Sequence, residues 1–435
     1  MVTEPVSLTL RLIDLIDSKP IEAQDREITT LFVLDAIACA IGARTSPQGY
    51  IFAQFYNQGG QDAGRQALTL GALIHTLEID DLHRASVVHP GCVVIPAAWA
   101  VARREEASGL AFLDAVLRGF EAACRVGMSV GPAHYEVWHN TATCGPFGAA
   151  MAAASLINLT QEQTLDALGN AGTQSSGLWE FLPAGAMSKH LHAGRAAASG
   201  IMAADLAKLG LTGPATILEG NKGFYKGLCP DPRPEAVYTG ADQPWQMHET
   251  SMKPWPSCRH THPAIDAAME LATQVGSDNI VSVLVETYQA AVNVCDRPQP
   301  KTEYDAKFSL QHCVAAALTV PDISFSSFNE PTRDKLLPLG DKVTLRACDP
   351  YEASYPESWG AQLTVTLDNG DTISTRRHYA KGDPQDRLTA DDVITKATGL
   401  MQKGGLNSPD SLIDQIMNLP QATSLPSLPL VGFDG

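Results

Sequence analysis

The sequence has few cysteines, and no two of them lie within a short motif. Nine cysteines are spread over 435 residues with no CxxC spacing. Disulfide frameworks and iron–sulfur clusters use cysteines at characteristic spacings, so this pattern argues against both. We therefore exclude a dehydratase of the cluster-dependent kind, and we expect reduced thiols in a cytoplasmic protein.

Long hydrophobic runs are absent as well. No stretch of about 18 apolar residues offers a membrane span. Residues 1–6, MVTEPV, have neither the basic start nor the apolar core of a secretion signal. The sequence therefore predicts a soluble cytoplasmic protein that has no membrane partner.

Positive charge is scarce. The chain has 31 Lys and Arg against 48 Asp and Glu, which gives a formal net charge of -17. Nucleic acids and anionic membranes bind basic surfaces, so we expect neither as a partner. A small anionic substrate stays possible, because the local field of a pocket can oppose the net charge.

Length and composition indicate two globular domains. The chain is 44% hydrophobic and 18% charged, and it exceeds the usual size of a single hydrophobic core. Helical periodicity dominates the first half, whereas β-branched residues become frequent after about Gly240. The predicted class is mainly α. A large all-helical bundle would occupy residues 1–250, completed by 400–435, and a smaller α+β domain would occupy 251–399.

The expected elements follow from the same periodicities. Helices are predicted at residues 8–17, 23–41, 97–104, 110–128, 148–156, 161–170, 193–209, 262–275, 306–318 and 390–404. Strands are predicted within residues 279–294, 342–347, 361–368 and 372–375. Gly42 is a plausible helix end, Thr160 begins a capping box, and DNGD at 368–371 predicts a hairpin turn.

The segment 75–96, HTLEIDDLHRASVVHPGCVVIP, concentrates ionisable residues between two apolar stretches. Its apolar spacing predicts a helix that presents Glu78 and Asp81 on neighbouring turns. That helix should end before Pro90, which places His89 on the loop before the next helix. Its charges could instead form weak surface pairs, but the flanking residues are too apolar for a wholly exposed segment.

Two further segments place basic residues before helices of small residues. In residues 138–148, WHNTATCGPFG, His139 stands where helix N–H groups could hold a carboxylate, unless the polar residues simply cap the helix. Residues 187–200, MSKHLHAGRAAASG, would form a positive patch suited to a di- or tricarboxylate. His190 and His192 could instead be two metal ligands, although a lone HxH pair has low specificity.

The second half of the chain contributes two more segments. Residues 253–267, KPWPSCRHTHPAIDA, include His260 and His262, which could form a site or merely the entry to a helix. Residues 306–312, AKFSLQH, end in His312.

Taken in order, these five segments resemble the signatures of the MmgE/PrpD family. The matches are the acidic EIDD run followed by His-Pro, the aromatic-His turn, a Lys-x-x-His-x-Gly run from Lys189, the KPWPSC run and AKFS. The chain departs from the family pattern in several places. Glu78 stands in place of Asp, Leu82 in place of Thr or Ser, and His312 in place of the usual Tyr. The spacing from Leu82 to His89 is one residue longer than in the decarboxylase branch, and Gly91 stands where Ser often follows the His-Pro.

The resemblance implies a helical domain and an α+β lid that bind small polycarboxylates without metal or organic cofactor, in a homodimer. The family's dehydration, decarboxylation and epimerisation share a carbanion next to a carboxylate, which needs a base, an acid and cations. We expect a hydro-lyase that dehydrates a 2-hydroxy polycarboxylate of the 2-methylcitrate type. An epimerase or decarboxylase is the close alternative. A zinc-dependent hydrolase and a non-catalytic carboxylate-binding protein are the alternatives from other classes.

The same resemblance assigns roles to residues. The expected catalytic residues are His89, His139, Lys189, His262, Asp81 and Glu78. The expected substrate-binding residues are Asp80, His192, Arg259, His260, His312 and Arg84. Imidazoles suit proton transfer because their pKa lies nearest neutrality. The lysine would hold the substrate carboxylates, and the protein carboxylates would orient the imidazoles or act as a base.

Overall fold

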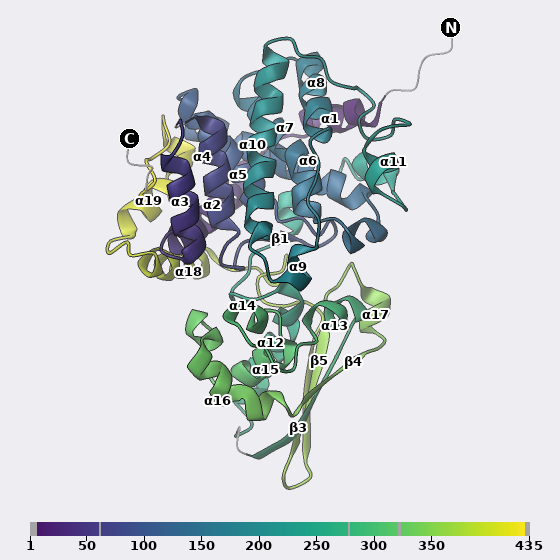
Figure 1. Ribbon diagram of the computed structural model, residues 1–435, viewed down its shortest axis with the longest axis vertical. Helices are drawn as coiled ribbons and strands as arrows, with labels where there is room; N and C mark the ends of the chain where they lie inside the picture. The colour runs from purple at the N-terminus through teal and green to yellow at the C-terminus, as the bar shows by residue number, and fades with distance from the viewer. Residues whose placement is uncertain (1–6, 61, 277–278, 321–322, 431–435) are drawn as a thin grey trace. The chain divides into compact units, whose positions relative to one another are not determined.

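The computed structural model describes residues 7–60, 62–276, 279–320 and 323–430 (Figure 1). The chain forms two compact units, Met1–Thr250 with Thr389–Gly435 and Ser251–Leu388. The predicted class is confirmed, because the protein is mainly α-helical with a small sheet-containing unit. Residues 1–6, on which the expectation of no secretion signal rests, lie outside the described residues.

The larger unit is a bundle of helices joined mostly by short loops. Its helices are α1 (Leu8–Ser18), α2 (Ala23–Ala43), α3 (Pro47–Asn57), α4 (Ala63–Ile74), α5 (Gly91–Arg104), α6 (Gly109–Ser129), α7 (Asn140–Leu156), α8 (Gln161–Gly172), α9 (Phe181–Ala184), α10 (Ser188–Lys208), α11 (Phe224–Leu228), α18 (Ala390–Lys403) and α19 (Asp410–Met417). Its short strands are β1 (Leu82–His83) and, at the boundary of the unit, β2 (Thr250–Ser251).

Helix α10 packs closely against α4 and α7, and the three helices lie side by side in Figure 1. Small residues make this approach possible. A Cβ atom at Gly194 would lie 2.1 Å from the carbonyl oxygen of Leu68, and one at Gly200 would lie 2.4 Å from Cβ of Ala149. Any larger side chain would push α10 away, since the interior is close-packed. The C-terminus of α4 therefore meets the N-termini of α7 and α10 at a fixed place.

The smaller unit contains a four-stranded sheet in the order β4-β3-β5-β6. Strand β3 pairs parallel to β4 and antiparallel to β5, and β5 pairs antiparallel to β6. Apolar residues of the sheet form one core with residues of α12 and α15. The elements are α12 (His262–Ala272), β3 (Ile280–Thr287), α13 (Gln289–Cys295), α14 (Glu303–Ala306), α15 (Leu310–Ala317), α16 (Glu330–Gly340), β4 (Val343–Ala347), α17 (Tyr351–Ser354), β5 (Ala361–Leu367) and β6 (Thr372–Arg377).

Most predicted elements exist, and several boundaries differ. The capping box at Thr160 and the hairpin between β5 and β6 are confirmed. Gly42 does not end its helix, because α2 continues to Ala43 and buries that glycine against Leu400 of α18. Residues 279–294 are not all strand, because α13 follows β3. The predicted domain boundary at residue 399 falls inside α18, which packs on α2 in the larger unit.

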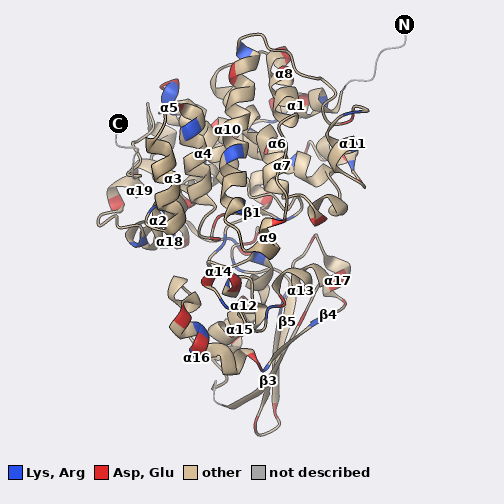
Figure 2. Cartoon of the chain, in the orientation of Figure 1, with Lys and Arg blue, Asp and Glu red and all other residues tan. Residues whose placement is uncertain are grey.

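Charge and hydropathy are distributed as in an ordinary globular fold. Figure 2 shows acidic and basic residues interspersed along the helices of the chain. Among the described residues, no single helix is both long and apolar enough to cross a bilayer. Helices α2 and α3 reach that length and composition only as a pair bent by 94°, and most of α2 is buried inside the unit.

Candidate active site

The acidic segment after α4 is a buried turn and not the predicted helix. Helix α4 ends at Ile74, and Glu78 has φ 61, in the left-handed region that non-glycine residues rarely adopt. On a helix, Glu78 and Asp81 would lie on one face and compete for the same partners. The turn directs them to different partners, so tertiary contacts override the helical pattern of the sequence.

Asp81 is bound to the start of helix α5. Its carboxylate accepts from the backbone N–H of Gly91 at 3.1 and 2.9 Å. A carboxylate at a helix N-terminus is favourable, because it satisfies free N–H groups and opposes the positive end of the helix dipole. A Cβ at Gly91 would lie only 2.8 Å from this carboxylate, so a larger residue there would displace the Asp81 side chain. The geometry gives Asp81 a capping position within the site.

Asp80 joins two of the imidazoles. Its Oδ2 accepts from His75 Nδ1 at 2.6 Å and lies 3.4 Å from His89 Nδ1. Burial by itself raises the pKa of Asp80, but the attraction of His75 and His89 and hydrogen bonds from both outweigh it and hold that pKa well below the usual value. Asp80 is therefore a carboxylate at neutral pH.

The protonation state of His75 follows from this contact. A carboxylate only accepts, so Nδ1 of His75 must be the protonated nitrogen. Burial lowers the pKa of His75, which leaves Nε2 as a lone pair in the neutral ring. Among the described residues, Nε2 of this buried ring has no hydrogen-bond partner. A neutral imidazole with an oriented, unused lone pair has the form of a general base.

Lys189 and Glu78 form a buried ion pair. Lys189 Nζ lies 2.6 Å from both carboxylate oxygens of Glu78, and the two side chains are 5% and 2% exposed. Lys189 is the second residue of α10, and the turn at Glu78 brings the carboxylate to it. The segment predicted to be a positive patch thus has its lysine charge balanced by Glu78.

Two further imidazoles lie beside His75. The ring of His139, just before α7, stacks on His75 with centroids 5.7 Å apart, and its Nδ1 lies 3.3 Å from Nδ1 of His192. Trp179 and Phe181 cover this pair, with ring centroids 4.9 and 6.3 Å from His139. These aromatic rings exclude water from one side of the cluster.

The environment keeps these imidazoles neutral. Burial, and then the neighbouring His75 and Lys189, set the pKa of His139 well below its usual value. Burial and Arg195 lower the pKa of His192 to about 4. Burial likewise lowers the pKa of His190, which bonds to the backbone of His75, to about 4. At neutral pH the cluster therefore has several bases and few acids.

The loop between β1 and α5 is tied to the start of α7. Asn140 Nδ2 donates to the carbonyl oxygen of Ser86 at 2.8 Å, and the backbone N–H of His89 donates to Thr141 Oγ1 at 3.0 Å. Arg84, also predicted to bind substrate, is buried in the same loop. These contacts hold His89 beside His75, with ring centroids 4.7 Å apart.

A metal ion could use one group of donors among the described residues. Atoms of His75, Asp80 and His89 lie within 4.8 Å of one another. However, neighbouring ligand atoms around a tetrahedral zinc lie about 3.3 Å apart, so the 2.6 Å contact of His75 with Asp80 is a hydrogen bond that a metal would have to break. His190 and His192 do not chelate one ion, because residues two apart on a helix point to different sides.

Three of the predicted site residues, Arg259, His260 and His262, lie in the smaller unit. Arg259 Nη1 donates to His262 Nδ1 at 2.8 Å, and the same guanidinium pairs with buried Asp383. His262 Nε2 donates to the carbonyl oxygen of Ser257 at 3.3 Å, so both of its ring nitrogens are occupied. His260 bonds to a tyrosine hydroxyl through Nδ1, and burial, and then Lys253, lower its pKa to about 3.

His312 has a structural environment of its own. Its Nε2 donates to the carbonyl oxygen of Ser327 at 2.8 Å, and its ring packs on Phe328. It therefore joins α15 to the segment before α16.

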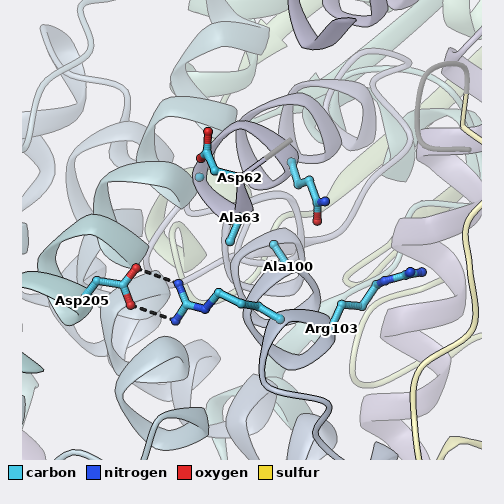
Figure 3. Close-up of a pocket in the computed structure, with 8 residues that line it drawn as sticks. Asp62, Ala63, Ala100, Arg103 and Asp205 are labelled. Carbon is cyan, nitrogen blue, oxygen red and sulfur yellow. Dashed lines mark hydrogen bonds and ion pairs between the residues drawn. The ribbon is translucent and has the colours of Figure 1, made fainter. Parts of the chain in front are cut away.

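A surface pocket of about 400 Å³ lies elsewhere in the larger unit (Figure 3). It is lined by the start of α4, the end of α5 and Asp205 of α10. Both carboxylate oxygens of Asp205 bind Arg104, at 2.7 and 2.8 Å. Among the described residues that line it, none belongs to the predicted site, and this pair already balances much of its charge.

Sequence reasoning missed His75, Trp179 and Phe181. His75 begins the acidic segment, but the helix predicted for that segment gives its imidazole no hydrogen-bond partner. Its spacing from Asp80, five residues on, becomes meaningful only with a turn between them. No local signal marks Trp179 and Phe181, because only the fold brings them to His139.

Comparisons with known proteins cover most of the chain. The profile of the MmgE/PrpD N-terminal domain matches residues 13–237, and that of the C-terminal domain matches residues 255–417. The cis-aconitate decarboxylase-like protein oryM of Aspergillus oryzae is 27% identical over 410 residues, covering 84% of this chain and 83% of that protein. Human cis-aconitate decarboxylase is 27% identical over 374 residues, covering 81% and 76%. The mitochondrial 2-methylcitrate dehydratase of Yarrowia lipolytica is 23% identical over 389 residues, covering 82% and 73%.

Proposed function

This chain belongs to the MmgE/PrpD family, and on that premise we propose that it is a lyase acting on a small polycarboxylate through a carbanion next to a carboxylate. The observation that supports this most is the neutral His75, whose Nδ1–H is held by Asp80 while its buried Nε2 has no partner among the described residues. Such a ring can take a proton from carbon.

The reaction we propose is dehydration of a 2-hydroxy polycarboxylate of the 2-methylcitrate type. Dehydration begins with removal of a proton beside a carboxylate, and the neutral His75 and His139 are suited to that step. Decarboxylation, in contrast, begins with loss of carbon dioxide, so its first step needs no base. Lys189 would stabilise the charge that develops on the substrate carboxylate, with Glu78 holding the ammonium in place.

Substrate binding would change the state of these bases. The cluster contains three buried carboxylates, Glu78, Asp80 and Asp81, and the buried ammonium of Lys189 pairs with the first of them. A polycarboxylate entering it would raise the pKa values of the neighbouring imidazoles, because opposite charge favours the protonated form. The bases become stronger when the substrate is bound, and one imidazole can then be the acid for the leaving hydroxyl.

The remaining predicted residues stay in the proposal with supporting roles. His89 and His192 would bind substrate carboxylates at the more exposed side of the cluster. The roles predicted for Arg259, His260 and His262 of the smaller unit stay predictions, and substitution of each residue tests them. We further propose a cytoplasmic homodimer that uses no metal.

Decarboxylation of cis-aconitate is the second candidate. The proteins named above with 27% identity include a cis-aconitate decarboxylase from human, whereas the 2-methylcitrate dehydratase is 23% identical. Both reactions use the same cluster, and they differ in whether water or carbon dioxide leaves.

The test is a ligand screen followed by product analysis. Metal-stripped protein is screened by thermal shift against citrate, 2-methylcitrate, cis-aconitate, tartrate and amino-dicarboxylates. A ligand at about 100 times its Kd should add about 2.7 kcal/mol to the free energy of unfolding. Proton NMR of each hit then identifies the product, with His139→Asn as the inactive control. If no acid stabilises the protein until zinc is restored, the proposal fails.

A further inference from the structure

The turn that presents Glu78 and Asp80 is also contacted from near the C-terminal end of the chain. Lys396 of α18 donates from Nζ to the carbonyl oxygen of Ile79 at 2.8 Å. The same ammonium lies 2.5 Å from Oδ1 of Asp35 on α2, and the lysine and aspartate side chains are 8% and 2% exposed. A buried ammonium thus bridges the turn and a core helix.

The position of this lysine is closely defined by the packing of α18 on α2. A Cβ atom at Gly404 would lie 2.0 Å from the carbonyl oxygen of Ile41, and one at Gly42 would lie 3.0 Å from that of Leu400. Arg44 Nε donates to the carbonyl oxygen of Gly404 at 2.6 Å. Backbones this close leave α18 little freedom to slide, so Lys396 reaches the turn from a fixed base.

The contact acts on the peptide group that joins Ile79 to Asp80. Rotation of that peptide group would swing Asp80 away from His75 Nδ1. The residue before Ile79, Glu78, already has a left-handed backbone conformation. A charge-assisted hydrogen bond to the carbonyl opposes such rotation.

We propose that Lys396, supported by Asp35, is a positioning residue of this site. Lys396 sets the peptide plane at Ile79, and thereby sets the hydrogen bond between Asp80 and His75. The catalytic meaning of this role rests on the proposed function, whereas the geometric role does not.

The test uses Lys396→Met, which keeps the length of the side chain and removes its charge. A displacement of about 1 Å at a catalytic group can cost on the order of 100-fold in rate. We expect kcat to fall at least ~10-fold while KM changes less than ~3-fold, and we expect Lys396→Arg to recover part of the loss. We also expect the downfield Nδ1–H resonance of His75 to shift or vanish in protein that carries isotope-labelled histidine.

Lys19→Met is the matched control. Lys19 is a buried lysine of the same unit, and its ammonium binds the carbonyl oxygen of Gln243 at 2.8 Å and Glu121 Oε1 at 3.2 Å. The Lys19→Met variant should lose a comparable free energy of unfolding, while its His75 resonance and kcat stay unchanged. If the Lys396 variant loses stability alone, with resonance and kcat unchanged, the inference is overturned.

Two further outcomes are also decisive. If Lys396→Met does not fold, Asp35→Asn, which leaves the ammonium in place, must reproduce a weaker form of the same changes; an unchanged His75 resonance in that variant rejects the inference. If the unmodified protein turns over none of the acids, the proposed function fails, yet the resonance still shows whether Lys396 positions Asp80.

Discussion

Replacing Asp80 by Asn should remove most of the catalytic activity while leaving the fold intact. Asn keeps the shape of the side chain and can still accept from His75 Nδ1, so the substitution isolates the charge of the carboxylate. When His75 takes a proton, it becomes a cation held against Asp80, and the transition state gains this attraction.

The size of the effect follows from the contact distance. With Nδ1 and Oδ2 2.6 Å apart, the centres of the two charged groups are about 4 Å apart, where unit charges interact by about 4 kcal/mol at an effective dielectric of about 20. Each 1.4 kcal/mol corresponds to a tenfold change in rate, so kcat should fall by roughly 1,000-fold.

The pH profile gives a second readout. The charge of Asp80 raises the pKa of His75 against the effect of burial. Without that charge the pKa of His75 falls further, so the rising acid limb of the kcat profile should move to lower pH. Steady-state kinetics across pH measure both changes.

Asp62→Asn is the matched control, because Asp62 caps the opposite end of α4 by accepting from the backbone N–H of Arg65 at 2.9 Å. Asn is an equally good N-cap, so this variant should keep kcat within ~2-fold. The reasoning is refuted if Asp80→Asn retains kcat within ~10-fold of the unmodified protein.

Three other predictions follow from the buried ionisable side chains. Glu78→Gln or Lys189→Met removes the ion-pair partner of a buried charge, so urea unfolding should show a loss of about 3–5 kcal/mol, and the double variant should recover stability without activity; single losses under ~1 kcal/mol would contradict this. Burial lowers the pKa values of His83 and His190 to about 4, so between about pH 6.5 and 4 the unfolded chain binds protons that the native protein does not. Unfolding free energy should therefore decrease by about 1.4 kcal/mol per pH unit per group as pH falls through that window, and a flat dependence in urea titrations would count against it. Binding of a polycarboxylate should raise the lowered pKa of His139, so the complex should take up protons. Calorimetry in buffers of different ionisation enthalpy should then show buffer-dependent binding heats, and binding should be tighter at lower pH. Buffer-independent heats would rule out this proton uptake.

Local pattern was sufficient for much of the fold. The predicted helix at residues 8–17 corresponds to α1, and the DNGD turn joins β5 to β6, because periodicity and turn chemistry act over a few residues. Helix α3 was not predicted, since its apolar residues are partly exposed and give a weak pattern.

The site was less accessible to local reasoning. The acidic segment has helical spacing, yet Glu78 turns the chain to reach Lys189, which lies 111 residues further on. Likewise Lys396 contacts Ile79 across 317 residues. Such partners are selected by the packing of α10 and α18, which no short motif encodes. Residue types at the site could therefore be predicted, whereas the pairs they form could not.

The central claim is that this cluster takes a proton from a carbon next to a carboxylate. The most direct test is proton NMR of 2-methylcitrate, citrate and cis-aconitate incubated with metal-stripped protein in heavy water. The account predicts that at least one acid exchanges the proton at that carbon for deuterium or loses water, and that Asp80→Asn suppresses both. Binding of an acid without any exchange or turnover would contradict it and would favour a carboxylate-binding protein.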